Sequence, residues 1–185
     1  MHVLPVRWTA LDFRNQLLFA DLARLPFLVR RLERLARKAL LLGLSAPLYL
    51  CDTFTGVVKA SERDSVYKGG EHSDTSIADV KALLQSFGVS QARILKGIFP
   101  NETAQLVPPG TVFRLVHVDV DAYHSAKDVL EWSWSLLVPG GIVIFDDYGD
   151  IGTTGVKQFV NELLPKKDRF VIHNLNGHAI LIKVA

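Results

Sequence analysis

The feature that most restricts the fold is an alternation of short apolar segments with longer amphipathic segments from residue 47 onward. The apolar segments have the length of β-strands, and the amphipathic ones repeat their apolar residues at helical spacing. The expected strands are 48–52, 92–97, 113–120 and 141–145, and the expected helices follow Ser76 and span 124–137 and 155–164. This order is typical of an α/β fold, with a mostly parallel, doubly wound sheet covered by helices on both faces.

The C-terminal end should add an antiparallel element to this sheet. The segments "RFVIHNL" and "HAILIKV" flank Asn176 and Gly177. An Asn-Gly pair between two apolar runs is the strongest short-range signal of a β-hairpin, because both residues tolerate positive φ. We therefore expect a hairpin at one edge of the sheet.

The first 46 residues have a different pattern. Leucines recur at three- and four-residue spacing over 9–25 and 27–43, which predicts two helices separated by Pro26. Residues 1–45 carry a net charge of +5 and the remainder −3, with the basic residues concentrated in 30–38. We interpret this basic stretch as a solvated helix face. The sequence thus predicts one domain, 1–185, with an atypical helical segment (1–46) and an α/β core (47–185).

Composition limits the cellular setting and the partners. Cys51 is the only cysteine, so no internal disulfide can form and a reducing, cytoplasmic location is expected. No apolar run has the length of a membrane span, and the N-terminus lacks the pattern of a secretory signal. No aromatic residues interleave the arginines, so we expect no nucleic-acid partner. The apolar faces of 9–43 predict a homodimer contact.

Carboxylates follow the expected strands at the points where each strand ends. Asp52 ends the first, Asp119 and Asp121 end the third, and Asp146 and Asp147 end the fourth. In doubly wound sheets, ligands bind beyond the carboxyl ends of the strands. If the last two strands are neighbours, three of these acids lie side by side and repel one another.

Two interpretations of these acids remain open at this point. An acid at a strand end can cap the following helix, as Asp147 could. Alternatively, Asp119, Asp146 and Asp147 share a proton or surround a cation, and an all-oxygen ligand set suits Mg²⁺.

Taken together, four blocks of sequence resemble the macrocin O-methyltransferase family of class I S-adenosylmethionine-dependent enzymes. The blocks are "LYLCDTFTGV" (48–57), "ILKGIFPNET" (94–103), "LVHVDVDAYHSAKDVLEW" (115–132) and "LVPGGIVIFDDYGDIGTTGVKQF" (137–159). The resemblance implies a class I methyltransferase-like, Rossmann-like fold. It also implies transfer of a methyl group from S-adenosylmethionine to a hydroxyl of a small molecule of the sugar or natural-product type, with Mg²⁺ bound.

The resemblance also implies roles for particular residues. Asp119, Asp146 and Asp147 match the metal ligands of the family, with Asp119 catalytic through the metal. His72 lies in the loop expected to cover the acceptor and is a candidate base. The positions expected to bind the cofactor are Asp52, for its ribose, with Thr53 and Phe54 beside it, and Gly97 and Phe99, near its adenine.

One departure and two alternatives accompany this resemblance. No G-x-G occurs in the chain, and residues 1–46 contain one glycine, Gly43, where the family fold has a central strand and a glycine-rich turn. A non-catalytic or truncated methyltransferase-like module is therefore one alternative, and weak cofactor binding is expected. The other is a phosphatase of the haloacid dehalogenase type, which also carries D-x-D after a strand, although the spacing from Asp121 to Asp146 is short for it.

Overall fold

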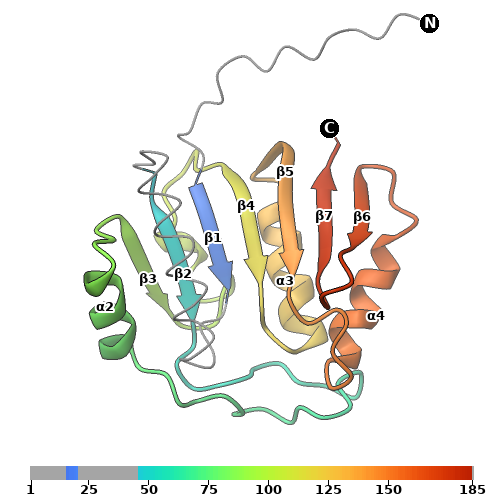
Figure 1. Ribbon diagram of the computed structural model, residues 1–185, viewed down its shortest axis with the longest axis horizontal. Coiled ribbons are helices and arrows are strands. Elements are labelled where there is room, and N and C mark those ends of the chain that lie inside the picture. The colour runs from blue at the N-terminus through green and yellow to red at the C-terminus, as the bar shows by residue number, and fades with distance from the viewer. Residues whose placement is uncertain (1–15, 21–45, 185) are drawn as a thin grey trace, which may run out of the picture.

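The structure, a computed structural model, describes residues 16–20 and 46–184. These residues form a seven-stranded sheet in the order β3-β2-β1-β4-β5-β7-β6 (Figure 1). The strands are β1 (Gln16–Ala20), β2 (Leu48–Asp52), β3 (Ala92–Lys96), β4 (Phe113–Val118), β5 (Leu137–Phe145), β6 (Arg169–His173) and β7 (Ala179–Lys183). The helices are α2 (Ile77–Ser86), α3 (Tyr123–Trp134) and α4 (Thr154–Leu163), with a short 3₁₀ turn at Ala104–Leu106.

The sheet is parallel from β3 to β5 and antiparallel at its C-terminal side. Strands β3, β2, β1, β4 and β5 pair in parallel, whereas β7 pairs antiparallel with both β5 and β6. The parallel strands therefore all end at one edge, which is the lower edge in Figure 1. This mixed α/β sheet agrees with the fold class that the alternating pattern predicts.

The prediction of a helix over 9–25 is wrong for residues 16–20. These residues form β1 at the centre of the sheet, between β2 and β4, and Leu18 is fully buried. A central parallel strand is covered on both faces and so reads as a continuous apolar run, which short leucine-rich helices also produce. A central strand, which the sequence patterns did not predict, is thus present. The homodimer contact expected from residues 9–43 stays a prediction. The other residues of 1–45, including the expected helix over 27–43, lie outside the described part.

Both faces of the sheet are packed, as the pattern predicts. Helices α3 and α4 cover one face, where their buried residues share a core cluster with Val116, Val118, Val143 and Phe145. Helix α2 packs on the opposite face against Leu48 and Leu50 of β2. Because β2 sends Tyr49 and Cys51 to the first face and its leucines to the second, all five of its residues are buried.

Helix α2 forms as its sequence predicts. The Ser76 hydroxyl accepts a hydrogen bond from the backbone N–H of Asp79 at 3.2 Å, which caps the helix start. Val80 and Leu84 are buried, and Gly88 adopts φ 68° just beyond the helix end.

Within the described part of the chain, the longest connection joins β2 to α2, over residues 53–76. Figure 1 shows it running beneath the carboxyl ends of the strands from β2 toward α4, and then back to α2. Here we call residues 53–75 the crossing loop. Among the described residues, no helix is both long enough and apolar enough to cross a membrane.

Candidate active site

Three acids meet where β4 and β5 end. Val118 pairs with Phe145, so the residues that follow these strands leave the sheet at the same level. Asp119, Asp146 and Asp147 each offer an oxygen, and these three oxygens lie within 4.8 Å of one another. The structure therefore brings together the three acids that the sequence placed at two strand ends.

The surroundings of Asp147 disfavour a negative charge. Its Oδ2 atom is buried and has no hydrogen-bond partner. Burial, followed by the nearby charges of Asp119, Asp121 and Asp146, raises the pKa of Asp147 to about 9. A bound cation would offset this repulsion, and three carboxylate oxygens are the ligands that Mg²⁺ prefers. The arrangement fits a divalent metal better than a helix cap, because the N-cap residue of α4 is Thr153 and no side-chain hydrogen bond caps that helix.

Two histidines approach Asp146 from neighbouring strands. The Nε2 atom of His178, just before β7, lies 2.9 Å from Asp146 Oδ1, and the Nε2 atom of His117, in β4, lies 3.6 Å from the same oxygen. The sequence analysis did not single out either histidine. Strand register could have pointed to His178, because a hairpin paired with β5 places it opposite Asp146.

His72 lies in the crossing loop beside the second acid of the D-x-D motif. Its Nε2 atom is 3.9 Å from Asp121 Oδ2, and its ring packs edge-on against Tyr67 with centroids 5.7 Å apart. Both His72 and Asp121 have positive φ, 62° and 58°. Non-glycine residues rarely adopt this conformation, and such strain is often found at functional sites.

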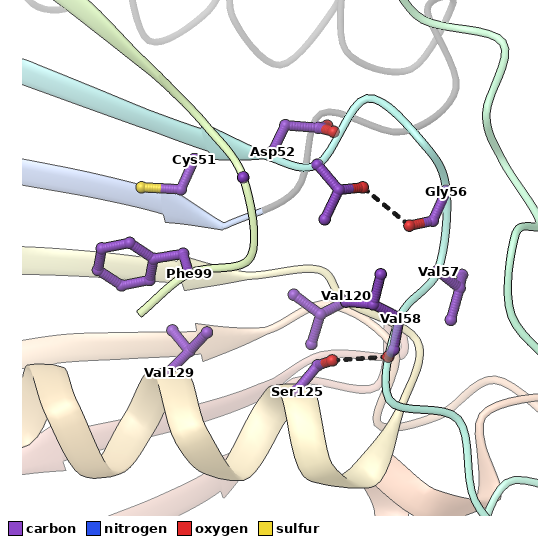
Figure 2. Close-up of a pocket in the computed structure, with 11 residues that line it drawn as sticks. Cys51, Asp52, Gly56, Val57, Val58, Phe99, Val120, Ser125 and Val129 are labelled. Carbon is purple, nitrogen blue, oxygen red and sulfur yellow. Dashed lines mark hydrogen bonds between the residues drawn. The ribbon is translucent and has the colours of Figure 1, made fainter. Parts of the chain in front are cut away.

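A small pocket opens at the same edge of the sheet, beyond β2 (Figure 2). Four of the five residues expected to bind a cofactor line it: Asp52, Thr53, Gly97 and Phe99. The side chain of Phe54 instead packs with the α2 cluster, while its backbone N–H donates to Asp52 Oδ1. The lining residues that the sequence analysis missed are Cys51, Gly56, Val57, Val58, Val120, Ser125 and Val129.

The crossing loop and the turn after β3 form two walls of this pocket. The Ser125 hydroxyl donates to the backbone carbonyl of Val58 at 2.8 Å, which Figure 2 shows between α3 and the loop. Gly97 has φ 138°, and a Cβ there would lie 2.9 Å from Glu102 Oε2. The pocket wall after β3 therefore requires glycine.

The strand order and the position of the site together define a class of protein. A parallel sheet ordered β3-β2-β1-β4-β5, followed by antiparallel β7 and by β6, which runs in the same direction as β5, is the class I methyltransferase-like fold. The structure of the O-methyltransferase NovP superposes with a TM-score of 0.69 and 19% identity, covering 92% of this chain and 72% of NovP. The calicheamicin methyltransferase CalS11 gives a TM-score of 0.69 and 20% identity, covering 91% and 71%.

Sequence comparison then identifies the family. Residues 42–172 match the macrocin O-methyltransferase (TylF) family, so the chain belongs to this family. This membership excludes the phosphatase alternative. The mycinamicin III 3''-O-methyltransferase of Micromonospora griseorubida is 29% identical over 112 residues, which cover 55% of this chain and 43% of that protein. The chain thus matches less than half the length of this relative.

Proposed function

We propose that this chain is an S-adenosylmethionine-dependent O-methyltransferase that acts on a hydroxyl of a small molecule and holds a divalent cation at Asp119, Asp146 and Asp147. One observation carries the proposal. The cluster of three acids and the pocket that begins at Asp52 lie at the same edge of the sheet, in a chain of the TylF family. A methyl donor and a metal-bound acceptor could therefore occupy neighbouring positions.

The pocket has the chemistry needed for the nucleoside part of the cofactor. Asp52, at the end of β2, can accept hydrogen bonds from the two ribose hydroxyls. Phe99, Val58 and Val129 supply apolar walls of the kind that hold a flat base. The structure of the O-methyltransferase TomG from Streptomyces achromogenes, solved in complex with SAM, has the same fold, with a TM-score of 0.57 and 18% identity over 93% of this chain and 74% of TomG.

The residues at the acid cluster would hold Mg²⁺, which lowers the pKa of a coordinated hydroxyl and fixes its position. His72 would take the hydroxyl proton as the carbon–sulfur bond of the cofactor breaks and the carbon–oxygen bond forms. The Asp121 carboxylate, 3.9 Å from the imidazole, would stabilise the imidazolium that results. The crossing loop over the strand ends would exclude water from the reacting atoms.

The names of two relatives support one class of acceptor. One is a mycinamicin III 3''-O-methyltransferase, and CalS11 is a calicheamicin methyltransferase. We therefore propose a sugar hydroxyl of a glycosylated natural product as the acceptor.

Calorimetry with S-adenosylmethionine, with and without Mg²⁺, tests this function directly. Binding of both ligands, followed by release of S-adenosylhomocysteine in the presence of a glycosylated macrolide, would support an enzyme. Metal binding without any cofactor binding would instead identify the non-catalytic module. Since the residues after β1 contain no G-x-G, weak cofactor binding stays our prediction. Asp52→Asn should weaken cofactor binding about tenfold and leave Mg²⁺ binding unchanged, because one charge-assisted hydrogen bond contributes about 1.5–3 kcal/mol.

A further inference from the structure

The β5–β7 pairing places His178 directly beside the acid cluster. Phe145 pairs with Ala179 in antiparallel register, so the next residues along each strand, Asp146 and His178, face each other. Their side chains meet with Nε2 of His178 2.9 Å from Oδ1 of Asp146. Asp146 is 11% exposed and His178 34% exposed, so this contact is partly shielded from water.

The loop before β7 fixes which nitrogen of His178 carries the ring proton. The Asn174 Oδ1 atom accepts hydrogen bonds from the backbone N–H groups of Asn176, at 2.9 Å, and of His178, at 3.1 Å. The amide nitrogen of Asn174 must then be the atom that lies 2.9 Å from His178 Nδ1. Because this amide nitrogen can only donate, Nδ1 is the acceptor, and the proton of the neutral ring resides on Nε2, facing Asp146.

We propose that His178, held by Asn174, is a positioning residue that fixes how Asp146 presents its oxygens to a cation. The proposal rests on the metal-dependent function proposed above. The contact from His178 to Oδ1 of Asp146 fixes the plane of that carboxylate, and therefore the direction in which its oxygens face the cluster. A histidine beside a ligating carboxylate is an outer-shell partner of the kind whose loss typically costs 10–100-fold in metal affinity.

A carboxylate held in one orientation has a consequence for metal choice. Mg²⁺ demands near-ideal octahedral geometry, whereas Ca²⁺ accepts a larger and more flexible shell, including bidentate carboxylates. His178 therefore favours Mg²⁺ over Ca²⁺ at the Asp119, Asp146 and Asp147 cluster. Loss of the imidazole removes this constraint on the orientation of the Asp146 carboxylate.

The test is titration of the full chain with Mg²⁺ and, separately, with Ca²⁺, by calorimetry. The variants are His178→Leu, which removes the ring nitrogens, and His178→Gln, which keeps an N–H donor at a similar reach. We expect His178→Leu to weaken Mg²⁺ binding at least tenfold and Ca²⁺ binding much less. His178→Gln should restore Mg²⁺ affinity to within about threefold of the original chain. The matched control is His124→Leu, at an exposed histidine on α3.

The outcomes separate this inference from the proposed function. If the original chain binds neither cation, the metal-dependent function fails. If it binds Mg²⁺ and His178→Leu binds equally well, or His178→Gln fails to recover what His178→Leu loses, the positioning role is overturned. A readout without metal is nitrogen NMR of the ring. The Nε2–H tautomer should dominate in the original chain and lose its dominance in Asn174→Ala, and an Nδ1–H tautomer in the original chain would contradict the inference.

Discussion

The buried carboxylate of Asp64, in the crossing loop, accepts a hydrogen bond at 2.9 Å from the backbone N–H of Tyr123, the first residue of α3. The preceding residue, Ala122, has no side chain able to cap the helix, so Asp64 supplies the cap from 59 residues away. The other oxygen of Asp64 accepts from the backbone N–H and the hydroxyl of Ser61. The loop that carries His72 is thereby fixed to the D-x-D motif that ends in Asp121.

Asp64→Ala should therefore lower stability and loosen the crossing loop. The substitution leaves the N–H groups of Tyr123 and Ser61 without their acceptor, which costs about 1–3 kcal/mol. Thermal unfolding together with limited proteolysis within residues 53–75 measures both effects. Asp74→Ala, at an exposed acid of the same loop, is the control and should change neither. Equal protease resistance of the Asp64 and Asp74 variants would show that Asp64 does not anchor the loop.

Gly155→Ala should destabilise the protein although alanine favours helices. A Cβ at Gly155 would lie 1.9 Å from Asp64 Oδ1 and 3.0 Å from Tyr123 Cβ. Such overpacking costs about 1–3 kcal/mol, more than the roughly 1 kcal/mol gained in helix propensity. Lys157→Ala, at an exposed position of α4, is the matched control. In urea unfolding, the double variant Asp64→Ala/Gly155→Ala should lose less than the sum of the single changes, and strict additivity would contradict the contact.

Asp147→Asn should stabilise the metal-free protein and remove its response to Mg²⁺. The buried, unpartnered Oδ2 and the three neighbouring acids oppose a charge at this position. Relief of a penalty of about 1–3 kcal/mol should raise the midpoint of thermal unfolding by several degrees. Asp150→Asn, at an exposed acid of the same turn, should shift neither quantity. A lower midpoint for Asp147→Asn without metal would mean that the carboxylate has a stabilising partner.

The two acids of the D-x-D motif should differ in their effect on Mg²⁺ binding. Asp119 contributes an oxygen to the cluster with Asp146 and Asp147, whereas Asp121 faces His72. We expect Asp119→Asn to weaken Mg²⁺ binding by tenfold or more and Asp121→Asn to weaken it less, as measured by calorimetry. A larger loss of Mg²⁺ affinity in the Asp121 variant would indicate that the metal binds closer to His72 than proposed.

The ion pair between Asp168 and Arg169 should stabilise the fold at neutral pH and lose this effect in strong acid. Hydrogen bonds from Arg169, and from the Trp134 indole, lower the pKa of Asp168 to about 2. Because the pKa of Asp168 is lower in the folded state than in the unfolded state, the ionised carboxylate stabilises the fold. This stabilisation is complete above the unfolded-state pKa, near 3.8, and is lost as the pH falls toward 2. Because the carboxylate is 43% exposed, the contribution is at most about 1 kcal/mol.

Urea unfolding of Asp168→Asn at pH 7 and pH 3 checks this dependence. The free energy of unfolding of Asp168→Asn should be lower than that of the original chain at pH 7, and the difference should be smaller at pH 3. A deficit of the same size at both values would show that packing, not charge, accounts for the effect. Asp74→Asn is the control at an exposed acid outside any such pair.

Local patterns were sufficient for most elements of the core. Helix α2 was predictable from Ser76 to Gly88, because a cap, a periodic apolar face and a terminating glycine are all properties of adjacent residues. The N-terminal extent of β5 was not predictable from local patterns. Leu137 belongs to this strand because it pairs with Phe113, and a register shift separates that pair from the pair of Leu115 and Ile142. The helix prediction is wrong for residues 16–20 for the same reason, because their strand conformation comes from their position between β2 and β4.

By itself, the sequence determined that acids end three apolar strands of an α/β chain, because strand periodicity and the positions of charged residues are written along the chain. Only the tertiary structure decided which of these acids meet, because that depends on the order and register of the strands. The pairing of β4 with β5 brings Asp119 to Asp146 and Asp147, and the antiparallel return of β7 brings His178 to Asp146. The burial that raises the pKa of Asp147 likewise depends on what packs around it, and no local pattern of residues specifies that.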